Sequence, residues 1–131
     1  MRSLPRVLKF GIRMFAPAIT REPKRWYPMI ERDISQTTVD SFFSSIGSLR
    51  RTDLRPRLSE IKVPIMGIYG SRDVIVHPKQ YEPLRAGVQQ ARIEVMPGSG
   101  HFPMLDEPDK YLGLIRSFLE APNGLGPEAT G

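Results

Sequence analysis

One short apolar run constrains the fold of this chain more than any other feature. Residues 61–70 read IKVPIMGIYG, a nearly continuous apolar run that ends in glycine. Such a run is typical of a strand that is buried on both faces, as in a parallel sheet. Pro64 fits only the start of this strand, because proline has no N–H to donate to a neighbouring strand. The sequence therefore predicts an α/β fold.

The residues after this run complete a regular α/β unit. Residues 91–96 alternate in character and predict a second strand, which a Gly- and Pro-containing loop follows. Between the strands, a helix is expected from Pro78 to about Gln89 or Gln90, with an irregularity at Pro83. A last helix is expected over 108–120. The order strand, helix, strand, helix predicts two parallel strands joined by a right-handed crossover.

The first 60 residues have a helical pattern that proline interrupts. Residues 37–51 place apolar side chains on one face of a helix that starts at Thr37 or Thr38, with Asp40 in the first turn. Proline disfavours helix at the residue before it, which predicts short helices joined by tight bends. The prolines concerned are Pro5, Pro17, Pro23 and Pro28.

Composition excludes several classes of protein. The 131 residues contain no cysteine, which excludes a disulfide framework, a thiolate metal site and a cysteine nucleophile. A reducing, cytoplasmic setting is the default expectation from this composition. With 40% hydrophobic residues the chain is apolar enough to bury a core. No apolar run approaches the roughly 18 residues of a membrane span, so stable membrane insertion is not expected.

Positive charge is concentrated in the first half of the chain. Residues 1–62 hold 13 basic and 6 acidic side chains, whereas residues 63–131 hold 6 basic and 8 acidic ones. A basic half allows binding to nucleic acid or to a membrane surface, and residues 1–18 also resemble an organelle transit peptide. However, the cations come in short pairs with no recognised binding module around them. The simpler interpretation is a set of solvated helix faces, and no nucleic-acid partner is expected.

Two candidate catalytic residues follow the two predicted strands. Asp73 lies three residues after Gly70, and His101 follows Gly100 directly. Because parallel strands end at the same edge of a sheet, this carboxylate and this imidazole should meet there. A carboxylate that accepts the Nδ1–H of histidine leaves Nε2 free as a general base. His77 could join them as a metal ligand, but it is more simply a helix-entry residue, and neither a metal nor a cofactor is expected.

Residues 61–76 and 96–111 together resemble the C-terminal part of the α/β-hydrolase family. In that family a Gly-x-x-Asp turn delivers the acid, here Asp73, and a later Gly-His turn delivers the histidine, here His101. A proline and an acidic-Pro pair, Glu107-Pro108, follow the histidine as they often do in the family. The resemblance implies a helical cap over 1–60, a partial core over 61–121 and a flexible tail over 122–131.

The nucleophile elbow of that family, Gly-x-Ser-x-Gly or a variant with Asp or Cys, is absent from the sequence. The resemblance therefore implies the C-terminal fragment of an enzyme that hydrolyses an ester, an amide or a similar small substrate, inactive alone. A dehalogenase- or epoxide-hydrolase-like member is also compatible, although an ester or amide is the leading expectation. Its sheet would need the missing N-terminal half or a partner. The alternatives are a non-catalytic remnant that folds with a partner, and a basic amphipathic module that binds membranes or nucleic acid.

Overall fold

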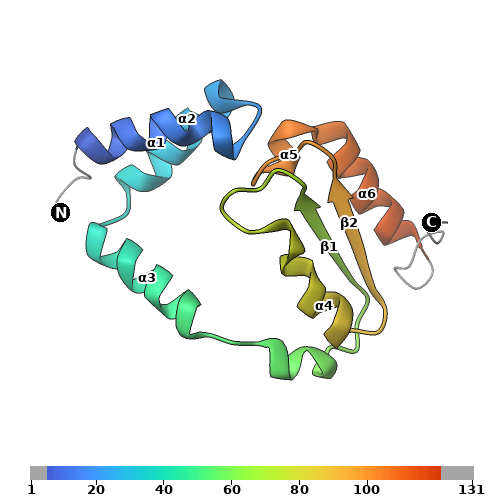
Figure 1. Cartoon of the computed structure of the whole chain (residues 1–131). Coiled ribbons are helices and arrows are strands. Elements are labelled where there is room, and N and C mark those ends of the chain that lie inside the picture. Colours follow the sequence, from blue (N-terminus) through green and yellow to red (C-terminus); the bar gives the residue numbers. More distant parts are fainter. Residues whose placement is uncertain (1–5, 122–131) are drawn as a thin grey trace.

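The computed structural model describes residues 6–121 as helices around a small parallel sheet (Figure 1). The expected tail over 122–131, and Pro5, lie outside the described residues. The elements in chain order are α1 (Arg6–Ile19), α2 (Pro23–Ser35), α3 (Val39–Arg51), the 3-10 helix η1 (Arg55–Glu60), β1 (Ile65–Gly70), the 3-10 helix η2 (Pro78–Tyr81), α4 (Glu82–Gly87), β2 (Ala91–Met96), α5 (Pro103–Asp106) and α6 (Pro108–Glu120).

The two strands pair in parallel, as the sequence predicts. The register runs from Ile65 opposite Ala91 to Gly70 opposite Met96, and β1 begins directly after Pro64. Both strands therefore end at the same edge of the sheet. The side chains at this edge come from the two loops that follow Gly70 and Met96.

Helices cover the two faces of the sheet from opposite sides (Figure 1). On one face, Leu84 of α4 lies against Gly67, where an added Cβ would come within 3.2 Å of its Cδ2 atom. On the other face, Nη1 of Arg92 donates to Oγ of Ser117 in α6 at 3.2 Å. The prediction that the first strand is buried on both faces was wrong. Gly70 alone is buried in β1, because a sheet with two described strands leaves an unpaired edge beside each.

The proline-based prediction of bends holds for one helix start and fails elsewhere. Pro23 opens α2 as its first residue, where the missing N–H costs nothing. Pro17 lies inside α1 and Pro28 lies inside α2, so neither ends a helix. Each proline removes one backbone hydrogen bond, whereas packing between α1 and α2 buries Ala16 and Trp26. Tertiary packing therefore outweighs the local cost.

The crossover helix is shorter than expected. It consists of the 3-10 turn Pro78–Tyr81 and the helix Glu82–Gly87, and it ends before Gln89. The predicted irregularity falls at the junction before Pro83. Helix α5 was not predicted, because its four residues are too few to show a period.

Helix α3 starts as the sequence predicts but does not bury its apolar face. Oγ1 of Thr38 accepts the N–H of Ser41 at 3.1 Å, and Asp40 lies in the first turn. Phe43 is 65% exposed and Leu49 is 70% exposed. In Figure 1 this helix stands apart from the sheet. No helix among residues 6–121 has the length and apolar character needed to cross a membrane.

The isolation of α3 makes its N-cap testable. We expect Thr38→Ala to reduce the stability of this helix by about 1 kcal/mol, because the Ser41 N–H loses its acceptor. Hydrogen exchange should then speed up in the first turn of α3 and stay unchanged in β1. Ser44→Ala, at an exposed position of the same helix, is the control. Faster exchange spreading into the sheet would contradict this separation.

Candidate active site

The acid and the histidine meet at the edge where both strands end. Nδ1 of His101 lies 2.9 Å from Oδ2 of Asp73. Because an ionised carboxylate can only accept, Nδ1 carries the proton and Nε2 is left available for chemistry. Oδ1 of Asp73 accepts the backbone N–H groups of Ile75 at 2.8 Å and Val76 at 2.9 Å. Both carboxylate oxygens are therefore held, and the acid is fixed before it orients the ring.

Backbone contacts tie together the two turns that carry this pair. A Cβ added to Gly70 would lie 2.0 Å from the carbonyl oxygen of Gly100, so the two turns contact each other through glycine backbone. The N–H of Arg72 donates to the carbonyl of Ser99 at 2.9 Å, and the N–H of Gly98 donates to Oγ of Ser71 at 2.7 Å. These bonds join the acid turn (residues 71–77) and the histidine loop (residues 97–102) into one connected unit.

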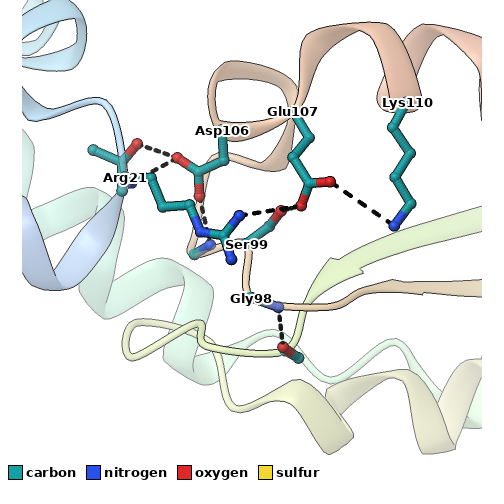
Figure 2. Close-up of polar contacts among 9 residues, drawn as sticks. Arg21, Gly98, Ser99, Asp106, Glu107 and Lys110 are labelled. Carbon is teal, nitrogen blue, oxygen red and sulfur yellow. Dashed lines mark hydrogen bonds and ion pairs between the residues drawn. The ribbon is translucent and has the colours of Figure 1, made fainter.

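The histidine loop is also bound to the turn between α1 and α2 (Figure 2). Asp106 and Glu107 carry most of these bonds, which reach Thr20 and Arg21 on the other side. Sequence analysis missed Asp106, Thr20 and Arg21. The Glu107-Pro108 pair, which Asp106 directly precedes, was the one sequence signal near this contact. Nothing in the sequence shows that the α1–α2 turn docks there.

The third candidate, His77, is not part of this cluster. Its Nδ1 accepts the N–H of Lys79 at 3.2 Å, so it caps the start of η2, which agrees with the helix-entry interpretation. Within the part of the chain that the structure describes, no group of three or more His, Asp or Glu side chains could hold a metal ion.

No serine of the described segment occupies a nucleophile elbow. Ser99 is fully buried in the histidine loop, and its hydroxyl donates to Oε1 of Glu107 at 2.9 Å. Ser71 follows β1 but leads into the acid turn rather than a helix. The serines of α3 lie on an exposed helix. The pair of Asp73 and His101 therefore has no nucleophile among residues 6–121.

An apolar cavity adjoins the imidazole. Its volume is about 560 Å³, and this open cavity is lined by residues of α1, α2 and the α3 region on one side and by Ile75, His101 and Phe102 on the other. Trp26, Phe42, Ile75 and Phe102 are among its lining residues, together with His101 itself. The ring centroids of Trp26 and Phe102 lie 5.8 Å apart. Those of Phe102 and His101 lie 4.9 Å apart in an edge-to-face arrangement. The site can thus hold an apolar group beside the imidazole of His101.

Relatives that are described as esterases align with more than half of this chain. No protein-family model matches the chain. A pimeloyl-[acyl-carrier protein] methyl ester esterase of Neisseria meningitidis serogroup C is 29% identical over 83 residues, which is 63% of this chain and 32% of the relative. The protein of the same description from Serratia marcescens is 33% identical over 73 residues, 56% of this chain and 29% of the relative.

Solved structures share the fold over most of the described chain. A hydrolase from Pseudomonas aeruginosa PA01 superposes with a TM-score of 0.72 at 22% identity, covering 87% of this chain and 44% of that one. An enol-lactonase from Burkholderia xenovorans LB400 gives 0.72 at 24% identity, covering 88% and 45%. The chain thus has the fold of part of an α/β hydrolase, and the predicted fold class is confirmed. It spans about a third of the length of the esterases from Neisseria meningitidis and Serratia marcescens.

Proposed function

We propose that this chain is the C-terminal part of an α/β hydrolase that cleaves esters with an apolar acyl group. Asp73 and His101 are its acid and base, and the nucleophile comes from a segment outside this sequence. Residues 1–60 form the cap of the enzyme, and residues 61–121 form the end of its core. The observation that carries the proposal is the 2.9 Å contact between Asp73 and His101 beside an apolar cavity.

The geometry supports general-base catalysis by the imidazole. Nε2 of His101 takes the proton of the nucleophile as it attacks the ester carbonyl, and Asp73 stabilises the imidazolium through Nδ1–H. The same imidazolium then gives its proton to the leaving alcohol. In the second half, Nε2 takes a proton from water as it attacks the acyl intermediate. The imidazolium then returns this proton to the nucleophile as its bond to the acyl group breaks and the acid is released. Each proton is therefore transferred through Nε2 of His101, while Asp73 holds the ring through Nδ1.

The sheet supports an origin of the nucleophile outside this chain. β1 has one edge paired with β2 and no described strand on the other edge, although a parallel sheet of two strands is rarely stable alone. An elbow on an adjoining strand would also end at the edge that carries Asp73 and His101. The part of the solved structures that this chain does not cover is large enough to supply such strands.

Two observations favour an ester with an apolar acyl group as substrate. The relatives in Neisseria meningitidis and Serratia marcescens are described as methyl ester esterases. Apart from His101 itself, the cavity is lined by aromatic and aliphatic side chains, with Asp33 and Thr37 as the polar exceptions. An acyl chain fills such a space by removing apolar surface from water, while its carbonyl stays near the imidazole.

The proposal is tested by restoring the missing part. The DNA immediately upstream of Met1 is read for an in-frame strand, Gly-x-Ser-x-Gly and helix, and the joined polypeptide is assayed with p-nitrophenyl esters of increasing acyl length. We expect hydrolysis of the esters and labelling of one serine by a fluorophosphonate. The 131-residue chain alone should show neither reaction.

Two results would contradict the proposal. A labelled serine in the 131-residue chain alone would place the nucleophile inside it. If no upstream elbow exists and no co-expressed polypeptide restores hydrolysis, the chain is a non-catalytic remnant instead. In that case the exposed apolar residues of α3 and the free edge of β1 would serve only for docking to another protein.

A further inference from the structure

A single carboxylate joins the histidine loop to the turn between α1 and α2 (Figure 2). Asp106 is the last residue of α5, five positions after His101. Its Oδ2 atom accepts the N–H of Gly100 at 2.6 Å. Its Oδ1 atom accepts the N–H of Arg21 at 2.7 Å and the hydroxyl of Thr20. One side chain thus satisfies three donors from two segments about 80 residues apart in sequence.

We infer that Asp106 is a positioning residue of the site: it fixes the Ser99–Gly100 peptide, one residue before His101, and with it the direction of the imidazole toward Asp73. It also fastens the α1–α2 turn, next to which the apolar cavity begins. The role assigned to the imidazole rests on the proposed function, but the positioning itself does not. Asp106 acts through the backbone and is not within the set of residues that contact the reacting atoms.

The peptide that Asp106 holds, Ser99–Gly100, is joined directly to the peptide that carries the N–H of His101. Gly100 is buried, and a Cβ at this position would lie 2.1 Å from the carbonyl oxygen of Ile19. The N–H of His101 donates to that same carbonyl at 2.8 Å. Rotation of the Gly100 peptide would therefore break the bond to Asp106 and move His101 away from Ile19 and Asp73 together. Thr20 is 3% exposed, so water cannot easily replace the lost bonds.

The neighbouring carboxylate, Glu107, makes a different kind of contact. Its Oε1 accepts the hydroxyl of Ser99, and the guanidinium of Arg21 lies 3.5 Å from the same atom. Lys110 is 3.9 Å from its other oxygen. All of these are side-chain bonds, and none reaches the peptides that flank His101. Glu107 therefore supplies a matched control for Asp106 at the adjacent position.

The test reads the His101–Asp73 hydrogen bond directly, by NMR of the full chain labelled with 15N-histidine. The Nδ1–H proton of His101 should resonate far downfield of the backbone amides, and Asp73→Asn should remove this signal and so assign it. We expect Asp106→Ala to abolish or broaden it. We also expect the amide of Gly100 to exchange about tenfold faster or more, because a charge-assisted bond to a buried donor is lost.

Two control variants separate positioning from general destabilisation. Thr20→Val removes the hydroxyl bond to Asp106 and lowers the melting temperature, but it leaves the bond to Gly100, so the His101 signal should persist. Glu107→Gln should leave the signal unchanged as well. If Asp106→Ala does not fold, Asp106→Asn replaces it: the smaller loss of acceptor should weaken the signal while the fold remains.

The outcomes are decisive either way. If the Asp106 variants lower the melting temperature as Thr20→Val does but keep the His101 signal, Asp106 is only structural and the inference is overturned. A wild-type chain without the signal overturns it too, since Asp106 would then not be positioning the ring. Neither readout requires hydrolysis. A signal that depends on Asp106 in an enzyme that cleaves no ester would sink the proposed function and leave this inference standing.

Discussion

Gly100→Ala is expected to lower the free energy of unfolding by at least about 3 kcal/mol, a large part of the stability of a small domain. The added methyl group would lie 2.1 Å from the carbonyl oxygen of Ile19, a distance at which the backbone itself must move. Moving it separates the end of α1 from the histidine loop. Urea unfolding followed by circular dichroism measures the loss.

Gly113→Ala is the matched control for this substitution. A Cβ at Gly113, on the exposed side of α6, would meet no atom within 4 Å. Alanine favours helix over glycine, so this variant should be stabilised by up to about 1 kcal/mol. If the two alanine variants have equal midpoints, the end of α1 does not rest on the histidine loop in solution, and the described docking of α1 and α2 is wrong.

His101→Ala in the completed enzyme is expected to reduce kcat/KM for an apolar ester by about 10⁴-fold or more, since the proton transfers lose their carrier. Asp73→Asn should cost a similar factor of about 10⁴, because the amide no longer selects the tautomer with Nδ1–H. KM should change little in both variants, since the cavity that holds the acyl group remains. Steady-state kinetics with p-nitrophenyl esters separates kcat from KM.

The control for these variants is Asp53→Asn, an identical change at a distant exposed position. The side-chain hydrogen bond from Arg55 lowers the pKa of Asp53 to about 2, so the pair is ionised at assay pH. Its loss should leave kcat/KM unchanged. Equal activity of the wild-type enzyme and the Asp73→Asn variant would show that the carboxylate 2.9 Å from His101 has no part in the reaction.

The acid–histidine pair could be predicted from sequence because both residues are set by local signals. An apolar strand that ends in glycine, followed by Asp73, and a second strand followed by His101 place both groups at one sheet edge through topology alone. No long-range information was needed beyond the pairing of two strands.

The junction at Asp106 could not be predicted in this way. Its bonds to Thr20 and Arg21 depend on how α1 and α2 dock onto the histidine loop, and the sequence carries no periodic signal for that contact. Packing between α1 and α2 explains why Pro17 did not end α1, because burial of Ala16 and Trp26 compensates for a lost backbone bond. In both cases tertiary contacts decided what local preference left open.

The aromatic contact between Trp26 and Phe102 makes the site visible to spectroscopy. Trp26 is the single tryptophan of the chain, is 5% exposed and lines the cavity next to His101. Its fluorescence therefore comes from one known place, without interference from other indoles. A shift of the emission maximum to longer wavelength would report that α2 has separated from the histidine loop and that the indole is exposed to solvent. Quenching or a blue shift on addition of an apolar ester would instead report entry into the cavity, so binding can be followed in unlabelled protein.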